Sequence, residues 1–149
     1  GFVAASLLAL CATALAQSPL STPDEEPFRG AAAPGSVAPD APLQGGRWLL
    51  CELDAHRFNL LVFGDAPVSL PPRLAPQINL VRLPFDADHA VAAARYDATA
   101  GTTYLLRPDQ HVSARWRRAP TPAQLQSALD RALARHLTER GAVTATATA

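Results

Sequence analysis

The sequence predicts a small α/β or α+β domain in which helices flank a mixed β-sheet. Two observations support this fold class: a series of short apolar runs bounded by turn-forming residues, and an amphipathic helix with clear start signals after them. Short apolar runs of this kind are typical of strands, and apolar residues at three-and-four spacing are typical of a helix packed on one face. The order strand, strand, strand, short helix, hairpin, helix favours a sheet with helices packed against it.

Composition allows one such domain and excludes some partners. The chain has 149 residues, of which 48% are hydrophobic and 17% charged, a composition typical of a globular protein. Thirteen basic residues balance thirteen acidic ones, so no basic surface is available for nucleic acid or an anionic membrane, and we expect neither as a partner. Because the chain lacks Met and begins with Gly1, we interpret it as a piece of a longer protein or a processed one.

Two segments precede residue 47. Residues 1–16 are almost continuously apolar and end in Ala14-Leu15-Ala16. They fit either a buried helix at the end of a missing upstream domain or a signal peptide without its basic start, and they are shorter than the ~20 residues of a membrane-spanning helix. Residues 17–46 are rich in proline, which blocks helices, so we expect an extended linker that joins two units.

Three apolar runs are predicted to be strands: 48–53, 57–63 and 77–83. The second and third runs are apolar on both faces, as expected for central strands. Cys51 lies within the first run and is expected to be a buried apolar side chain. A short helix is predicted over 86–96, with Asp86 as its N-cap.

Residues 103–116 predict a β-hairpin, because Pro108 suits the second position of a type I turn between two apolar runs. The last helix is predicted to begin at Thr121, with Gln124 as its capping-box partner, and to end near Gly141. Residues 142–149 are expected to be a disordered tail. The core face of the last helix is predicted to be Leu125, Ala128, Leu129, Ala132, Leu133 and Leu137.

Reactive chemistry has little support in the sequence. Cys11 and Cys51 form no CxxC pair, and the glycines are too dispersed for a dinucleotide-binding turn. We therefore predict no catalytic, cofactor-binding or metal-binding residues. The histidines lack the spacing of metal ligands and are interpreted as surface residues: His56, His89, His111 and His136.

The strongest candidates for an interface or a turn are Arg107, Pro108, Asp109 and Trp116. Arg107 and Asp109 fit either a contact across a domain or subunit interface or a turn that satisfies its own backbone, and we favour the turn. Trp116 fits either an interface anchor or the core, as does Trp48. The arginines around Trp116 are expected to be solvated: Arg115, Arg117 and Arg118.

The hairpin also carries a family resemblance. Residues 104–116, which read YLLRPDQHVSARW, resemble the YLVRPDG-x-VA-x-R signature near the end of FAD-dependent aromatic hydroxylases of the phenol hydroxylase and 3-(3-hydroxyphenyl)propionate hydroxylase type. Residues 34–43 are similar to the PG-x-x-AP-x-x-x-L segment that opens the C-terminal domain of that group. Residues 21–24 are similar to the stretch just upstream of that segment, and residues 58–63 are similar to the family's F-x-LL strand. The resemblance covers about residues 20–140.

This resemblance implies a redox-inactive, thioredoxin-like domain over residues 47–141 that packs against an upstream FAD-binding domain or forms a homodimer. The parent protein would be a cytoplasmic FAD-dependent monooxygenase that uses NAD(P)H, with its catalytic site outside this chain. Thiol chemistry would require a cysteine after the first central strand, where this chain has Gly64-Asp65-Ala66-Pro67. The alternative is a secreted or periplasmic, non-catalytic binding module with a clipped signal peptide.

The sequence departs from the family pattern at two places. Gln110 stands where the signature has Gly, a change that a type I turn tolerates but that removes the option of a positive φ. Four prolines break the segment in which a thioredoxin fold carries its first long helix, so we expect that helix to be short or absent: Pro67, Pro71, Pro72 and Pro76.

Overall fold

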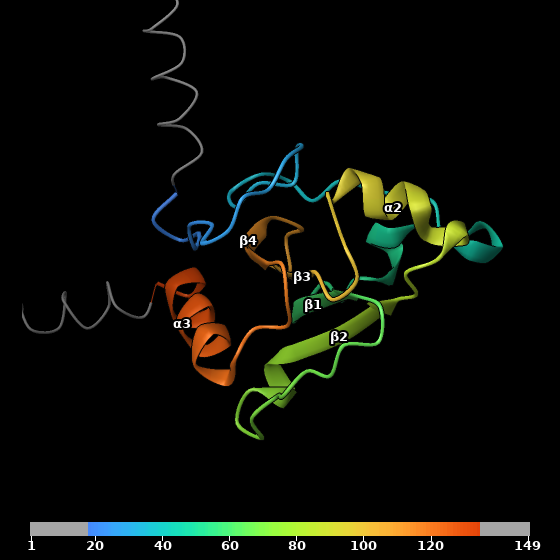
Figure 1. The fold of residues 1–149 in the computed structure, drawn as a ribbon. Coiled ribbons are helices and arrows are strands. Elements are labelled where there is room, and N and C mark those ends of the chain that lie inside the picture. The colour runs from blue at the N-terminus through green and yellow to red at the C-terminus, as the bar shows by residue number, and fades with distance from the viewer. Residues whose placement is uncertain (1–17, 135–149) are drawn as a thin grey trace, which may run out of the picture.

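A four-stranded mixed sheet with a helix on either face forms the centre of the molecule (Figure 1). The computed structural model describes residues 18–134, so the apolar segment 1–16 and the tail 142–149 lie outside the described residues. The strands are β1 (Phe58–Phe63), β2 (Ile78–Leu83), β3 (Thr103–Leu106) and β4 (Val112–Trp116). Their order in the sheet is β2-β1-β3-β4; β1 pairs with β2 in parallel and with β3 antiparallel, and β3 pairs with β4 antiparallel. The predicted fold class is confirmed.

The core lies on both faces of β1, whose six residues are all buried. Because successive side chains of a strand point to opposite faces, Leu61 and Phe63 pack on one side and Leu60 and Val62 on the other. The first side is covered by helix α2 (Ala90–Arg95) and by the segment before residue 44, and the second by helix α3 (Pro122–Ala132). The run predicted at 57–63 is therefore a central strand, as expected.

The strand β2 differs from the prediction in its position. It was expected to be central, but it forms one edge of the sheet and pairs only with β1 among the described residues. Its buried residues are the first and the last, and Leu80 is 39% exposed. Apolar composition on both faces does not distinguish this edge from the centre of a sheet.

The proline-rich segment is packed into the domain, although we expected a linker between two units. Its backbone follows the outer edge of β4: the N–H groups of Thr22, Gly35 and Ala38 donate to the carbonyls of Ser113, Val112 and Gln110 at 2.8, 2.8 and 2.7 Å. This pairing covers an edge that would otherwise be open. Four residues of the segment are buried in the core: Ala32, Ala38, Ala41 and Leu43.

The prediction of a strand at 48–53 was wrong, because this run forms a 3-10 helix at Leu49–Glu52. The carboxylate of Asp40 accepts a hydrogen bond from the Leu50 N–H at 3.0 Å, and the Leu49 N–H donates to the carbonyl of Ala41 at 2.9 Å. These local contacts replace a strand ladder. Leu49 alone is buried within the 3-10 helix, whereas Cys51 is exposed rather than buried.

The connection from β1 to β2 contains no α-helix, in agreement with the expectation drawn from its prolines. Its only regular element is the 3-10 helix Ala75–Gln77. Apolar side chains of the connection still cover the sheet: Leu74 is buried, and Val68 and Leu70 pack against the same cluster as α3. The connection thus supplies the burial that a helix supplies elsewhere.

Asp86 is an N-cap as predicted, but it caps the 3-10 turn Ala87–His89 that precedes α2, whose own N-cap is His89. The Asp86 side chain accepts a hydrogen bond from the His89 N–H at 3.1 Å, and one 3-10 turn leads into the helix. The imidazole of His89 was expected at the surface, but it is only 3% exposed and lies 2.7 Å from Asp86 Oδ1. Its place inside the capping turn, against the core, explains the difference.

The start of α3 also follows the prediction, because Thr121 and Gln124 form a reciprocal capping box and the helix buries Leu125, Ala128 and Leu129. The end of α3 differs from the prediction, because the helix stops at Ala132 and does not extend to Gly141. Ala134 adopts a left-handed φ of 54°, and Leu133 is 41% exposed. Gly141 and Leu137 lie outside the described residues.

The hairpin turn uses the backbone conformation that its sequence disfavours. The Gln110 N–H donates to the carbonyl of Arg107 at 2.9 Å, which closes the predicted turn around Pro108. Gln110 itself has φ of 67°, and the strand pairing is irregular just beyond it. A residue without glycine's freedom therefore occupies a left-handed position.

Replacing Gln110 with glycine should stabilise the protein. We expect Gln110→Gly to raise the free energy of unfolding by about 0.5–1 kcal/mol, because relief of the left-handed strain exceeds the entropy that glycine costs. Urea unfolding measures the change. Gln110→Ala, which keeps the Cβ atom, is the control and should give no gain; equal gains from both variants would contradict the assignment to backbone strain.

Candidate functional site

The predicted hairpin residues Arg107 and Asp109 pair with each other. Arg107 Nη2 lies 2.6 Å from Asp109 Oδ2, and Asp109 Oδ1 accepts from the His111 N–H at 3.3 Å. Partial burial opposes ionisation of Asp109, but the His111 N–H and the Arg107 charge lower the pKa of its carboxyl group. Both side chains stay about one-third to one-half exposed, so the pair satisfies the turn and remains accessible.

The two tryptophans have different environments. Trp116 is 7% exposed and packs in the core beneath α3, together with Phe58 and Leu125. Trp48 is 47% exposed and pairs through its backbone with Pro42. Of the two, Trp48 is the one available to a partner.

The end of β1, where thiol chemistry would require a cysteine, carries Gly64-Asp65-Ala66. Here the Arg82 guanidinium donates to the carbonyl of Ala66 at 2.8 Å. Cys51 lies near the other end of the sheet, because its neighbour Leu50 accepts a hydrogen bond from the Gln110 side chain in the hairpin turn. The end of β1 thus has no cysteine beside it, neither in residues 64–67 nor through Cys51.

The described residues also do not fit FAD. Dinucleotide binding places a pyrophosphate at the N-terminus of a helix that directly follows a strand, but no α-helix follows β1 before β2. The helix α2 has only six residues and continues a 3-10 turn that the Asp86 carboxylate caps, and the N-terminus of α3 carries the capping box of Thr121 and Gln124. Neither helix therefore follows a strand in the arrangement that dinucleotide binding requires.

Residues 18–134 contain no metal site of the usual ligand types. No three side chains of the metal-ligating types come together there. No helix in the same range has both the length and the apolar character needed to cross a bilayer.

A cluster that we call the arginine clasp is the most specific polar arrangement in the described residues. It consists of Arg115 and Arg117 of the hairpin arm, their partners Asp24 and Asp97, and Phe28 between the two guanidinium groups. The guanidinium carbons of Arg115 and Arg117 lie 4.4 and 3.8 Å from the centre of the Phe28 ring. Such contacts between cations and aromatic faces are attractive, so the clasp holds residues 24–28 onto the sheet.

Arg115 is the buried half of the clasp. Its side chain is 4% exposed, and its Nε and Nη2 atoms donate to the two oxygens of Asp24 at 2.9 and 2.6 Å. Its remaining Nη1 group donates to the carbonyl of Ala32 at 2.8 Å. Burial lowers the pKa of Arg115, but the interactions with Asp24 and Tyr104 outweigh burial and hold the pKa above its ordinary value.

Arg117 and Asp97 form the outer half of the clasp. Arg117 Nη2 lies 2.6 Å from Asp97 Oδ2 and 2.9 Å from the carbonyl of Pro27, and Asp97 also accepts from the Arg29 N–H at 2.7 Å. The Arg29 N–H, followed by the Arg117 side chain, lowers the pKa of the Asp97 carboxyl group. We expected these arginines to be solvated, and for Arg115 that prediction was wrong, because its guanidinium group is buried against Asp24. Asp24 lies 91 positions away in the sequence, so the sequence pattern around Arg115 does not indicate this pair.

Two tyrosines tie the clasp to the rest of the core. The Tyr104 ring meets Phe28 edge to face with centres 6.0 Å apart, and its hydroxyl donates to the Tyr96 carbonyl at the end of α2. The Tyr96 hydroxyl donates to the Pro39 carbonyl at 2.6 Å. Burial, the dominant cause, raises the pKa of both hydroxyls, which keeps them protonated as donors. The first residue of the YLLRPDQ run thus has a structural role.

Loss of the Asp24 charge should destabilise the domain strongly. We expect Asp24→Asn to lower the free energy of unfolding by about 2–3 kcal/mol, because it leaves the buried Arg115 guanidinium uncompensated. Asp109→Asn removes a carboxylate from an exposed pair and should cost less than ~1 kcal/mol. Equal losses in denaturant unfolding would show that Arg115 does not depend on Asp24.

Asp97 should make stability depend on acid pH. A carboxyl group whose pKa is lowered on folding stabilises the protein above its unfolded pKa, near 3.8, and this contribution is lost as the pH falls through the folded value. The stability difference between wild type and Asp97→Asn should therefore be largest near pH 7 and shrink below pH 4. Asn tolerates the positive φ of 46° at this position, and a pH-independent difference would contradict the assignment.

Comparison with known proteins places this fold in a family. The family model described as "Aromatic-ring hydroxylase, C-terminal" matches residues 31–136. A search of curated proteins gave no match. The matched range begins within the proline-rich segment and includes the clasp residues Arg115, Arg117 and Asp97.

Solved structures share the fold. The flavin-dependent monooxygenase PieE, solved with FAD and substrate, is similar over 88% of this chain at 23% identity with a TM-score of 0.56. Aklavinone-11 hydroxylase, solved with FAD and aklavinone, is similar over 78% at 21% identity with a TM-score of 0.57, and the RebC-10x variant over 78% at 26% identity with a TM-score of 0.51.

This chain spans only 28%, 25% and 22% of those three proteins, respectively. The family model, in contrast, matches more than half of the chain in one continuous range. This match shows that the chain belongs to the aromatic-ring hydroxylase C-terminal domain family.

Proposed function

We propose that this chain is the redox-inactive C-terminal domain of an FAD-dependent monooxygenase that hydroxylates an aromatic ring. The family match over residues 31–136 is the observation that carries the proposal. Two structurally similar proteins were solved with FAD, one with a substrate and the other with aklavinone, which supports FAD as the cofactor of the longer protein. NAD(P)H is the proposed electron donor, and the proposed compartment is the cytoplasm.

The domain's proposed task is packing rather than chemistry. The end of β1 carries Gly64-Asp65-Ala66 in place of a thiol, and the start of α3 carries a capping box. The domain also presents a surface that includes the accessible pair Arg107–Asp109 and the exposed ring of Trp48. We propose that this surface contacts the upstream FAD-binding domain or a second subunit.

Flavin binding tests this division of labour. FAD titrated into the 149-residue chain should show no quenching of flavin fluorescence, because no α-helix directly follows β1 to hold a pyrophosphate. The complete polypeptide that ends in this domain should purify with FAD and consume NAD(P)H in the presence of a phenolic compound. Micromolar FAD binding by the chain alone, or a complete polypeptide without flavin, would overturn the proposal.

A further inference from the structure

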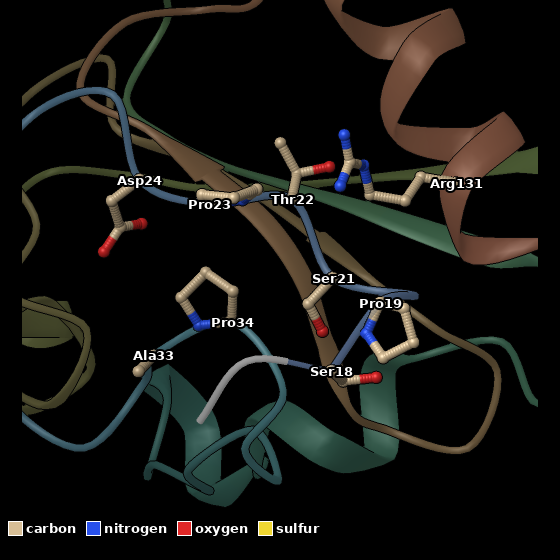
Figure 2. A pocket seen from close by; sticks show the side chains of 9 residues that line it. All are labelled: Ser18, Pro19, Ser21, Thr22, Pro23, Asp24, Ala33, Pro34 and Arg131. Carbon is tan, nitrogen blue, oxygen red and sulfur yellow. The ribbon is translucent and has the colours of Figure 1, made fainter. Parts of the chain in front are cut away.

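The two edges of the sheet differ in what lies beside them. The β4 edge is covered, because the proline-rich segment pairs with its backbone and Asp24 pairs with Arg115. The pocket in Figure 2, which Thr22, Asp24 and Arg131 line, lies beside this covered edge. On the outer side of β2, in contrast, no strand or segment of residues 18–134 pairs with the backbone (Figure 1). An open edge of this kind is a template for a further strand.

The unpaired backbone groups of β2 belong to alternate residues. The Gly64 N–H donates to the Leu83 carbonyl at 2.7 Å, so Leu83 faces β1, and the alternation of a strand turns the N–H and C=O groups of Leu80 and Arg82 outward. Within residues 18–134 these groups have no hydrogen-bond partner. Ile78 also faces outward, but its N–H already closes the preceding 3-10 turn, so only its carbonyl is available.

The features that usually protect an open edge are missing from β2. Natural edge strands carry prolines, bulges or exposed charges that discourage pairing. β2 contains no proline, pairs with β1 in an unbroken register, and has one charged residue, Arg82. The Arg82 guanidinium is directed back to its own chain, because it donates to the carbonyls of Ala66 and Gly64 at 2.8 and 3.4 Å. The edge is therefore open to another strand.

We propose that β2 pairs antiparallel with β2 of a second copy of this chain, around a two-fold axis at Leu80. In this register Leu80 exchanges both backbone hydrogen bonds with Leu80 of the second copy, and each Arg82 N–H donates to the Ile78 carbonyl opposite. Every outward N–H group of β2 then has an acceptor. Because the axis relates the two copies symmetrically, the contact closes as a dimer and does not continue into a fibre.

The side chains of β2 are complementary to themselves in this register. Leu80, which is 39% exposed in one copy, meets Leu80 of the other, and apolar pairs across strands are stabilising. The two Arg82 residues lie four positions apart along the paired strands, or roughly 13 Å, which exceeds the Debye length of about 8 Å at physiological salt. Phe85, which is 48% exposed, comes level with the exposed residues Ala75 and Pro76 of the second copy.

Other registers fit less well. A register centred on Arg82 places two like charges opposite each other, which is destabilising. A register centred on Ile78 brings two N–H groups that are already in use to the axis, and it sets Pro76, which has no N–H, opposite Leu80. A register midway between Leu80 and Arg82 pairs each leucine with an arginine and loses the apolar contact. The donors, the charge and the apolar groups of β2 thus match the same strand in the reverse direction, which identifies a second copy as the partner.

The inference goes beyond the proposed function. The β2 edge is separate from the surface that includes Arg107, Asp109 and Trp48, and the pairing requires neither flavin nor an aromatic substrate.

Amide hydrogen exchange, measured by NMR on the 149-residue chain, tests the pairing without a mutation. Exchange of the Leu80 and Arg82 N–H groups should slow at least ten-fold as the chain passes from monomer to dimer with rising concentration. Val81 donates toward β1 and should be protected at every concentration. A chain that sediments as a monomer up to millimolar concentration would overturn the proposal. Protection of Leu80 and Arg82 in such a monomer would assign the edge to a contact within one copy.

Cysteine cross-linking tests the register. Residues of a hydrogen-bonded antiparallel pair have Cα atoms about 5.5 Å apart, a separation that a disulfide spans. In a background with Cys11→Ser and Cys51→Ser, we expect Leu80→Cys to form an intermolecular disulfide under mild oxidation at least ten times faster than Arg82→Cys. The Arg82 positions are roughly 13 Å apart along the strands. Equal rates would contradict a two-fold axis at Leu80.

A charge at the axis tests the contact energetically. Leu80→Arg places two like charges opposite each other, so the dimer dissociation constant from sedimentation equilibrium should rise at least ten-fold. Val37→Arg, at a 59% exposed site outside β2, is the matched control and should leave the constant unchanged. An unchanged constant with Leu80→Arg, or an equal rise with both variants, would overturn the proposal. Leu80→Cys adds no charge, so the cross-link decides the question even where Leu80→Arg does not fold.

Discussion

The buried pairing of Arg115 with Asp24 is the interaction on which the rest of the structure depends. A guanidinium group whose side chain is 4% exposed is costly to bury unless it is paired and hydrogen-bonded, and here each of its three nitrogen atoms donates to an acceptor. The acceptors belong to a segment with no α-helix and few large apolar side chains. The pairing therefore converts a proline-rich stretch into part of the domain.

This constraint explains how a small sheet manages its edges. β4 would expose a row of unpaired backbone groups, and the segment held by the clasp covers them through bonds from Thr22, Gly35 and Ala38. The same segment places Ala32 and Ala41 over Leu61 and Phe63. One long-range ion pair, between Arg115 and Asp24, thus completes both an edge and a face of the sheet.

Local signals were sufficient for the elements whose causes are local. The cap of the 3-10 turn before α2, the capping box of α3, the hairpin turn and the central strand each depend on residues within a few positions, such as Thr121 with Gln124. The errors arose where distant contacts decide the conformation. Asp40 holds Leu49–Glu52 in a 3-10 turn, and Asp24 buries Arg115 across 91 positions. The local pattern around Leu49–Glu52 does not indicate Asp40, and the pattern around Arg115 does not indicate Asp24.

In the candidate site, too, the sequence predicts the features with local causes but not those that depend on distant contacts. The lack of a thiol after β1 and the self-contained turn at Arg107 and Asp109 are readable from residue types alone. The clasp is not, because it assembles residues that lie far apart in the sequence, such as Asp24 and Arg115.

Amide hydrogen exchange measures the central claim, that the segment before residue 47 belongs to this domain. The N–H groups of Thr22, Gly35 and Ala38 donate to β4 and the hairpin turn, so their exchange should be slowed as much as that of the β3 amides. Exchange of all three at the rate of an unstructured peptide, with β3 still protected, would show that the segment is a linker after all.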